Sequence, residues 1–335
     1  MVIRYSPWGE IEWVMSRLPR IEKWGFLGCI STEERSLSAW NWLQNNKKVD
    51  YYEMWKIEDP KTKYSPYKDL GEEKYEERKK IYTDMGGEAP SVFTLLNSDN
   101  HLSEHFHPFL EKTDGNVIID ISTMPKRWFF PMIKECLEED SVKSLLITYT
   151  KANHYSKIQG EDPMAWMHLP SFGEIGRKRE KMLIISAGYQ PLSLPEWIGN
   201  SENQQIYVLF PFPASIAGYS RTWDFIRAIE SDSGQLNENN IKYVPGFNLP
   251  SIYDAICNII ENEKKEPTFM PYGPKPVSLA FAILATQLHF PVGYTQPMYY
   301  NPLYSSGADK TMSYLLKESG KELYKLPQNL KKIFD

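Results

Sequence analysis

The sequence predicts an α/β protein with two tandem Rossmann-like halves, each built on a mainly parallel sheet, arranged as a pseudo-dimer. Short β-branched runs alternate with helical segments along the 335 residues, a pattern typical of parallel strands joined by right-handed crossover helices. A strand–turn–helix–strand unit at residues 116–155 has a partner at residues 268–300. The length also suits two domains of about 150 residues each.

The first half is predicted to span residues 1–157. An edge element over residues 1–23 precedes the first strand, and Ser31 and Thr32 begin the helix after that strand, because hydroxyl residues cap helix N-termini. Residues 61–87 are highly charged and are interpreted as a solvated helix and loop inserted into this half. The remaining pattern predicts strands at 25–30, 51–57, 91–96, 117–121 and 145–149, and helices at 31–44, 102–110 and 126–137.

A second half is predicted to span residues 180–302. Residues 156–179, rich in Gly, Pro and basic residues, form the expected linker to it. The tail at 303–335 is expected to be helical, with one or two amphipathic helices. Apolar runs predict strands at 182–186, 206–210, 241–244, 268–272 and 292–295, and helices at 221–229, 250–261 and 275–288.

Three short matches suggest that the halves are repeats. Residues 40–43 (WNWL) match 223–226 (WDFI), Pro125-Lys126 matches Pro274-Lys275, and Tyr149-Thr150 matches Tyr294-Thr295. The number of residues that separates matched positions falls sharply from the first match to the second. An insertion in the first half explains this fall, which supports the interpretation of the charged segment.

The composition argues against several classes of protein. A net charge of −5 gives no broad basic surface, so duplex nucleic acid is not an expected partner. No apolar run approaches the length of a membrane span, about 18 residues, and the N-terminal residues do not follow a signal-peptide pattern. Cys29, Cys136 and Cys257 lie in or beside apolar runs and are expected to be reduced, which favours a cytoplasmic protein.

Two lysines are the leading candidates for a binding site. Lys126 and Lys275 each follow a strand and open a helix, where free backbone N–H groups and the helix dipole favour an anion such as phosphate. A lysine in the first turn opposes the dipole, so its presence in both halves needs an explanation. The alternative is that both lysines only face solvent.

Further candidates are expected on the same rim of each sheet. Tyrosine and threonine at the last strand ends would suit a nucleobase by stacking and edge hydrogen bonds, or would pack as ordinary strand-end residues. Small and hydroxyl residues after the first strands would let a ligand approach the backbone, and one arginine in each half could face phosphates. The candidate ligand-binding residues are Ser31, Thr32, Arg35, Ser122, Thr123, Lys126, Tyr149, Thr150, Ser215, Arg221, Gly273, Lys275, Tyr294 and Thr295.

Motifs for common cofactors are missing from the sequence. There is no GxxxxGK[ST] loop and no GxGxxG after a strand, so neither a P-loop ATPase nor a dinucleotide cofactor is expected. His101, His105 and His107 lie close together, but no cysteine or carboxylate at ligand spacing completes a set. We therefore expect neither a metal site nor a cofactor.

A strand that ends in a short polar turn, whose lysine begins a helix in both halves, resembles the CARF and SAVED ligand-sensing domains of prokaryotic antiviral systems. Here the turns read Ser122-Thr123-Met124-Pro125-Lys126 and Tyr272-Gly273-Pro274-Lys275. They keep the lysine and depart from the family's usual order of small residue, Thr, Lys. The resemblance implies a cyclic or linear oligonucleotide ligand in a groove between the halves. It also implies a separate effector chain as partner, because no effector domain is recognisable in this sequence.

Three functions are compatible with these observations. The first is a regulatory or sensor module that binds a nucleotide-like phosphorylated ligand and acts on a separate effector chain in antiviral defence. The second is a metal-independent enzyme for a nucleotide or related substrate, in which the two lysines stabilise charge on phosphate oxygens. The third is a structural subunit of a larger complex, with the charged segment and the tail as partner surfaces.

Overall fold

The structure of the chain is a computed structural model, and its two compact units are described separately. It describes residues 7–18, 23–60, 67–98, 102–156, 160–174, 179–199, 205–212, 216–233 and 236–334. Unit 1 comprises Met1–Asp162 and Met298–Leu323, and unit 2 comprises Pro163–Pro297 and Tyr324–Asp335. The chain therefore enters unit 2, returns to unit 1 and ends in unit 2.

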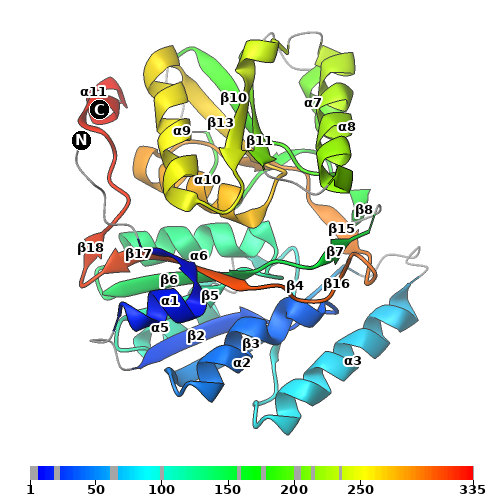
Figure 1. Ribbon diagram of the computed structural model, residues 1–335, viewed down its shortest axis with the longest axis vertical. Helices are drawn as coiled ribbons and strands as arrows, with labels where there is room; N and C mark the ends of the chain where they lie inside the picture. The colour runs from blue at the N-terminus through cyan, green and yellow to red at the C-terminus, as the bar shows by residue number, and fades with distance from the viewer. Residues whose placement is uncertain are drawn as a thin grey trace. The chain divides into compact units, whose positions relative to one another are not determined.

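Unit 1 is built on one mainly parallel sheet (Figure 1). Its strands are β1 (Trp8–Glu10), β2 (Trp24–Cys29), β3 (Val49–Glu58), β4 (Ser91–Thr94), β5 (Asn116–Asp120), β6 (Ser144–Thr150), β17 (Thr311–Glu318) and β18 (Lys321–Glu322). They lie in the order β1-β17-β6-β5-β2-β3-β4, and β18 pairs with β17. The strands from β2 to β6 are parallel, whereas β17 is antiparallel to both β6 and β1.

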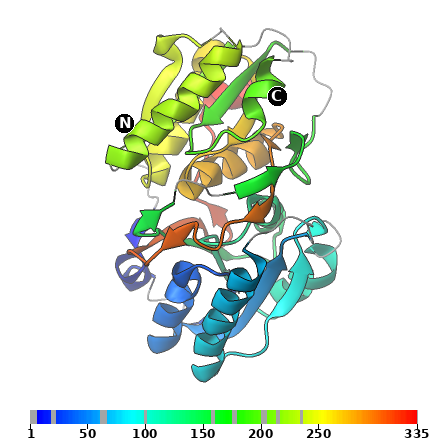
Figure 2. The same cartoon turned by 90° about the vertical axis from the view of Figure 1, so that its right-hand side faces the viewer.

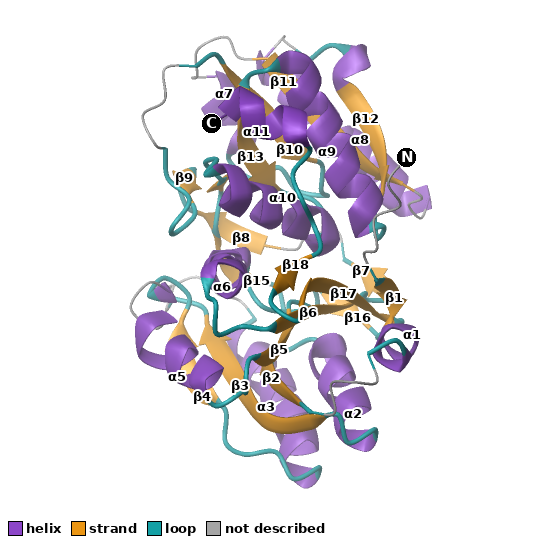
Figure 3. Cartoon of the chain, turned by 90° about the vertical axis from the view of Figure 1, so that its left-hand side faces the viewer, coloured by secondary structure: helices purple, strands orange, loops and turns teal. Residues whose placement is uncertain are grey.

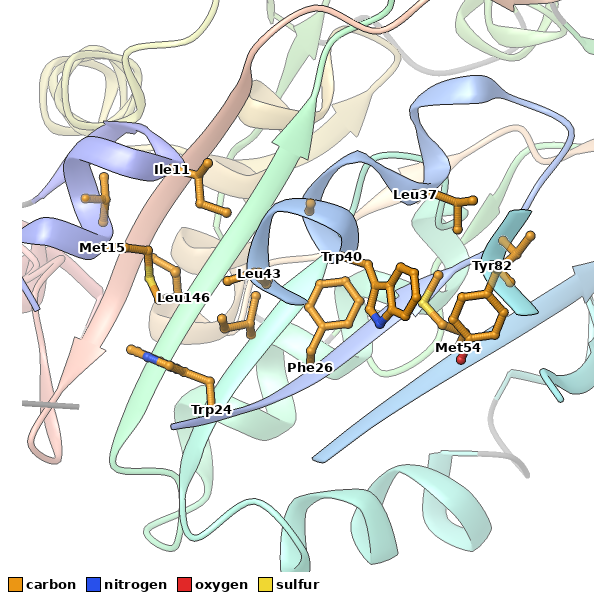
Figure 4. Close-up of a cluster of buried hydrophobic side chains, with 14 of the residues drawn as sticks. Ile11, Met15, Trp24, Phe26, Leu37, Trp40, Leu43, Met54, Tyr82 and Leu146 are labelled. Atoms are coloured by element: carbon orange, nitrogen blue, oxygen red, sulfur yellow. The ribbon is translucent and has the colours of Figure 1, made fainter. Parts of the chain in front are cut away.

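Helices cover both faces of this sheet. They are α1 (Ile11–Ser16), η1 (Glu34–Leu37), α2 (Ser38–Asn45), α3 (Lys68–Asp84), the π-helical η2 (Leu102–Phe106), α5 (His107–Glu111) and α6 (Lys126–Glu138). Side chains of α1, α2 and α3 form a buried cluster against one face (Figure 4). α2 and α3 lie side by side there (Figure 2), with Trp40 and Tyr82 ring centroids 4.7 Å apart. On the other face, Trp55 of β3 contacts Trp128 of α6, with centroids 5.9 Å apart.

Lys317 of β17 caps the C-terminal end of α6. Its side chain is buried, and its ammonium donates to the carbonyl oxygens of Cys136, Leu137 and Glu139 at 3.5, 3.5 and 2.9 Å. The last carbonyls of a helix lack partners within the helix, and the helix dipole favours a cation there. β17, which follows unit 2 in the chain, therefore contributes polar as well as apolar contacts to unit 1.

Unit 2 contains a smaller parallel sheet with helices on both sides of it (Figure 3). Its strands are β10 (Lys181–Ser186), β11 (Gln205–Phe212), β12 (Ile241–Pro245) and β13 (Glu266–Pro271), and its helices are α7 (Leu194–Gly199), α8 (Ile216–Ser233), η3 (Glu238–Asn240), α9 (Leu249–Glu263), α10 (Lys275–Leu288) and α11 (Gln328–Phe334). The strand order is β12-β11-β10-β13, with parallel pairs throughout. α7 packs against α8, and α9 packs against α10.

Short ladders complete the described part of the chain. β7 (His154–Tyr155) pairs with β16 (Ser305–Ser306), β9 (Met167–His168) with β14 (Gly293–Tyr294), and β8 (Gly160–Pro163) with β15 (Pro297–Tyr300). β8 and β15 lie where the chain leaves one unit for the other. Among the helices of the described ranges, none combines the length and apolar character needed to span a bilayer.

The parallel strands follow the same order in both units. By order along the chain, they lie as third, second, first and fourth: β4-β3-β2-β5 in unit 1 and β12-β11-β10-β13 in unit 2. α3 and α8 both connect the second strand to the third, and α6 and α10 both follow the fourth. Phe269 of β13 also forms a parallel bridge with Val292, in the place that β6 takes beside β5.

The charged segment at 61–87, predicted to be an insertion, contributes a connecting helix to unit 1. It contains α3, whose place between strands is the place of α8 in unit 2. The match of residues 40–43 with 223–226 pairs α2 with α8, which follow different strands, so it does not reflect the repeat. The matches at the two lysines and at the two Tyr-Thr pairs fall on corresponding elements.

The C-terminal tail is mainly extended, which corrects the prediction of a helical tail. Of the described residues 303–334, only α11 is helical, and the rest includes β16, β17 and β18. β17 lies inside the sheet between β1 and β6, and its central residues 313–317 are all buried. The strand reads Thr-Met-Ser-Tyr-Leu-Leu-Lys-Glu, and its short apolar run of Tyr314 to Leu316 lacks the alternation that distinguishes a strand from a helix. The second half also ends before 302, because Met298–Leu323 belongs to unit 1.

The cap on α6 predicts a stability effect. Lys317→Met keeps the apolar stem but leaves the last carbonyls of α6 without their donor, so we expect the free energy of unfolding to fall by about 1–3 kcal/mol. Chemical denaturation measures this. Lys321→Met, at an exposed lysine of β18, is the control and should change little. Equal stabilities of the two variants would contradict the capping role.

Candidate ligand-binding site

A network of buried hydroxyl groups holds the turn between β5 and α6 in unit 1. Ser122 Oγ donates to Asp120 Oδ1 at 2.6 Å and accepts the backbone N–H of Thr150 at 2.7 Å. Thr148 Oγ1 donates to the same Asp120 oxygen at 3.0 Å. All four residues are completely buried. Ser122 and Thr150, both expected to contact a ligand, therefore position the turn, and their polar atoms face protein groups.

A second hydrogen bond ties this turn to the first strand of the unit. Thr123 Oγ1 donates to the carbonyl oxygen of Cys29, the last residue of β2, at 2.7 Å. Ser31 Oγ accepts the backbone N–H of Glu33 at 3.1 Å, a common local bond for a serine before a helix. Ser31, Thr32 and Thr123 are only half-buried. These three predicted residues thus lie at the carboxyl ends of neighbouring strands and keep some exposed surface.

Arg35 lies inside unit 1 and not on its rim. Its side chain is 2% exposed, forms an ion pair with Glu33 at 2.8 Å, and donates from Nη1 to the Thr150 carbonyl at 3.0 Å. Three aromatic rings surround the guanidinium, with centroids 5.8, 5.7 and 6.0 Å from Cζ: Tyr149, Tyr155 and Tyr304. The expected contacts of Arg35 with phosphate and of Tyr149 with a base are therefore not supported, because both side chains are buried within the protein.

Two acidic residues outside the predicted ligand-binding set form hydrogen bonds with the segment Met298–Leu323. Glu33 accepts a hydrogen bond from the Ser305 hydroxyl, and Glu34 Oε2 accepts the backbone N–H of Gly307 at 2.9 Å. Both glutamates directly follow Ser31 and Thr32, which the sequence predicted as a helix start and as candidate ligand-binding residues. The role of the glutamates depends on a contact more than 270 positions away in the chain, which local sequence does not indicate.

Lys126 is the first residue of α6, as predicted. The preceding Pro125 is extended (φ −60°, ψ 148°) and makes no side-chain cap to the helix. Lys126 is half-buried, and desolvation lowers the pKa of its ammonium to about 7. A lysine in water has a pKa of about 10.4. At neutral pH, Lys126 therefore exists in both its charged and its neutral form.

The corresponding turn of unit 2 needs a glycine. The backbone N–H of Gly273 donates to Ser186 Oγ, at the end of β10, at 2.8 Å. A Cβ atom at Gly273 would lie 2.7 Å from both the Ala187 carbonyl oxygen and Ser186 Oγ. That approach is too close for any side chain, so the glycine lets the turn contact the end of the first strand.

Tyr272 takes the role in unit 2 that Ser122 has in unit 1. Its hydroxyl accepts the backbone N–H of Thr295 at 3.1 Å and hydrogen-bonds Thr295 Oγ1 at 2.7 Å. Thr295 Oγ1 also lies 3.1 Å from Ser193 Oγ. Thr295 is completely buried, and Tyr294 is buried beside Tyr272 with ring centroids 5.2 Å apart. Tyr294 and Thr295 therefore serve the packing of the turn, as Tyr149 and Thr150 do in unit 1.

Both units thus place a lysine at the start of the helix after the fourth strand. Lys275 is the first residue of α10, follows Pro274 and is half-buried. The turn before the lysine is bonded to the ends of β2 and β6 in unit 1, and to the end of β10 and to Thr295, which follows β14, in unit 2. The structure therefore gives Lys126 and Lys275 the same place in their own units, which the sequence match predicted.

The two remaining candidates belong to the α8 region. The Arg221 guanidinium lies over the ring of Tyr189, with Cζ 5.5 Å from the centroid, and Arg221 is half-buried. Tyr189 follows β10, so this pair lies at the carboxyl end of the unit 2 sheet. Ser215 lies outside the described residues.

The histidine-rich segment shows no metal geometry in the described residues. No group of three or more His, Cys, Asp or Glu side chains there is arranged to hold a metal ion. His107 Nε2 lies 3.3 Å from Glu135 Oε2 and His105 Nε2 lies 4.0 Å from Glu104 Oε2. His101 is outside the described residues.

Comparisons with known proteins add no family. No protein-family model matches the chain, and no curated protein matches its sequence. A fold of this class is compatible with many functions, so function has to be inferred from the chemistry at the rims of the two sheets.

The buried ion pair of Arg35 predicts a large loss of stability on truncation. Arg35→Met leaves Glu33, whose side chain is 12% exposed, without its cation, and we expect unfolding to become easier by about 3 kcal/mol. Arg227→Met removes an ion pair whose side chains are 71% and 68% exposed, and should cost about 0.5 kcal/mol or less. Urea denaturation compares the two variants. Similar losses would show that Arg35 is no more than a surface charge.

The lowered pKa of Lys126 predicts a pH dependence of stability. Because the pKa is about 7 in the folded chain and about 10.4 in the unfolded chain, the folded state binds fewer protons between these values. The free energy of unfolding therefore rises with pH above 7, by at most about 1.4 kcal/mol per pH unit for this one group.

Lys126→Met removes this contribution. The variant should exceed the native chain in stability at pH 7, and its advantage should shrink by pH 9, as measured by denaturation at both pH values. Lys80→Met, on the exposed surface of α3, controls for the loss of a charge. An advantage that stays constant with pH would show that Lys126 titrates normally.

Proposed function

We propose that the chain is a regulatory module that binds a nucleotide-like phosphorylated ligand at the carboxyl rim of its sheets and passes this state to a separate effector chain. The observation that carries the proposal is the lysine at the start of the helix after the fourth strand in both units. Two independent sequences, with different side chains in the turn, keep the lysine and the bonds that position it.

The chemistry of this position favours phosphate. A helix N-terminus presents backbone N–H groups that have no partner in the helix, and its dipole attracts negative charge. A lysine there is unfavourable until an anion binds, because its own charge opposes the dipole. The lowered pKa of Lys126 means that a bound phosphate would also draw a proton onto the amine, since a nearby negative charge favours the charged form.

We also propose that the two units are Rossmann-like halves of a pseudo-dimer. Their common strand order and the corresponding positions of α6 and α10 support this. Such sheets bind ligands at the carboxyl ends of their strands, where both lysines lie. The resemblance to CARF and SAVED domains adds an effector partner and a role in antiviral defence to the proposal. The three cysteines are free and buried, which supports a reducing compartment, the cytoplasm.

One observation favours the second candidate, a metal-independent enzyme. A lysine with a pKa of about 7 has a large neutral fraction at physiological pH, and lysines of this kind serve as general bases. The same residue would then take a proton from a substrate instead of only attracting its phosphate.

Ligand binding tests the proposal directly. A panel of mononucleotides, cyclic oligonucleotides and inorganic phosphate is screened by thermal shift, and binding is then measured by calorimetry. We expect at least one phosphorylated compound to stabilise the chain, by about 2.7 kcal/mol at a hundred times its Kd. Lys126→Met and Lys275→Met should each weaken binding about tenfold or more, because each removes a charge-assisted hydrogen bond. The affinity should also fall between pH 7 and pH 9, as Lys126 loses its proton.

Lys80→Met controls for charge in this experiment and should bind as the native chain does. Phosphorus NMR of the same mixtures shows whether a bound compound is converted, which would favour the enzyme. A folded chain that no phosphorylated compound stabilises would refute both the sensor and the enzyme.

A further inference from the structure

An exposed aromatic cluster lies at the carboxyl ends of β11 and β12 in unit 2. Phe212, Tyr219 and Tyr243 are 48%, 39% and 56% exposed, whereas large aromatic side chains are mostly buried in soluble proteins. Ring centroids of Phe210 and Tyr243 are 5.0 Å apart, those of Phe212 and Tyr243 are 6.1 Å apart, and those of Phe210 and Tyr219 are 5.4 Å apart. The buried Phe210 therefore contacts two of the exposed rings, Tyr219 and Tyr243, and Phe212 contacts Tyr243.

The position of this cluster is set by strand register. Phe212 is the last residue of β11, and Tyr243, the middle residue of β12, pairs with Phe210. The sheet ends at β12, so the cluster occupies one end of the rim on which Lys275 lies. Neighbouring strands are about 4.8 Å apart, so β11 and β13 are separated by about 10 Å along the rim. A nucleotide bound with its phosphate at β13 can reach β11 with its base.

A cationic group lies between these two ends. Arg221 belongs to α8 and holds its guanidinium over Tyr189, which follows β10. β10 lies between β11 and β13. The rim of unit 2 therefore carries, in order, exposed aromatic rings, an arginine and a lysine, which is also the order of groups that contact a base and its phosphate.

We propose that Phe212, Tyr219 and Tyr243 form the nucleobase subsite of unit 2, on which a purine or pyrimidine ring stacks. This inference rests on the proposed function, because it supplies the base contact for the phosphorylated ligand. Aromatic faces bind bases of any sequence by stacking, so the subsite recognises the class of ligand and not one base. Tyr149 and Tyr294, the residues first expected to stack, are buried and cannot do so.

The test compares AMP with ribose 5-phosphate, which has the same phosphate and sugar but no base. Calorimetry measures both Kd values for the native chain and for Tyr243→Ala, Phe212→Ala and Tyr243→Phe. Trp13→Ala removes an exposed aromatic ring from unit 1, 47% exposed, and is the matched control. Thermal melting confirms that each variant folds, and light scattering reports its oligomeric state.

We expect AMP to bind more tightly than ribose 5-phosphate by about tenfold or more. Tyr243→Ala and Phe212→Ala should remove most of this difference without changing the affinity for ribose 5-phosphate, while Tyr243→Phe and Trp13→Ala should keep it. Equal affinities of the native chain for AMP and ribose 5-phosphate would overturn the proposal. So would unchanged AMP binding in the alanine variants, and a change of oligomeric state alone would identify the cluster as a protein contact.

These outcomes separate the two proposals. If the phosphorylated panel stabilises the chain but the aromatic variants bind AMP as before, only the base subsite is wrong. If no phosphorylated compound binds, the base subsite and the proposed function are both wrong.

Discussion

In each unit, two hydrogen bonds hold the turn before the candidate lysine against neighbouring strand ends. In unit 1 a serine hydroxyl accepts the N–H of Thr150, and Thr123 donates to the end of β2. In unit 2 a tyrosine hydroxyl and a glycine N–H make the equivalent connections to Thr295 and Ser186. The residues differ, but the turn donates the second bond in both units: from a side chain to a backbone carbonyl in unit 1, and from a backbone N–H to a side chain in unit 2. Three of these four bonds are buried, so breaking one of them would leave an unsatisfied group at a cost of about 1–3 kcal/mol.

Unit 1 adds a second constraint, because it is completed by a segment that follows unit 2 in the chain. Met298–Leu323 inserts β17 between β1 and β6, and polar bonds secure it at both ends of the sheet. Lys317 donates to the C-terminal carbonyls of α6, and Glu33 and Glu34 accept from the loop around Ser305. Arg35 neutralises Glu33 within unit 1. A buried charge is tolerated only with its partner. Arg35, which was expected to contact a ligand, therefore stabilises unit 1 instead.

The sequence predicted the strands and helices of the parallel sheets well, because buried β-branched runs and helical periodicity are local signals. The position of Lys126 and Lys275 was predicted for the same reason, since a proline before a helix start is local too. Two errors came from non-local causes. The tail was expected to be helical because β17 is buried on both faces and shows no alternation. Arg35 was placed on the rim because the three tyrosines that enclose it, Tyr149, Tyr155 and Tyr304, lie far from it in the chain.

The carboxyl ends of the two sheets therefore differ in their aromatic side chains, although the order of their parallel strands is the same. In unit 1 the rings of Tyr149, Tyr155 and Tyr304 enclose the arginine of the chain itself, so the aromatic groups there already have a cationic partner. In unit 2 the aromatic rings at β11 and β12 remain exposed. The proposed ligand, with one base and one phosphate, would therefore find exposed aromatic rings beside a lysine turn in unit 2. The two lysine turns therefore have the same place in their units but different aromatic surroundings.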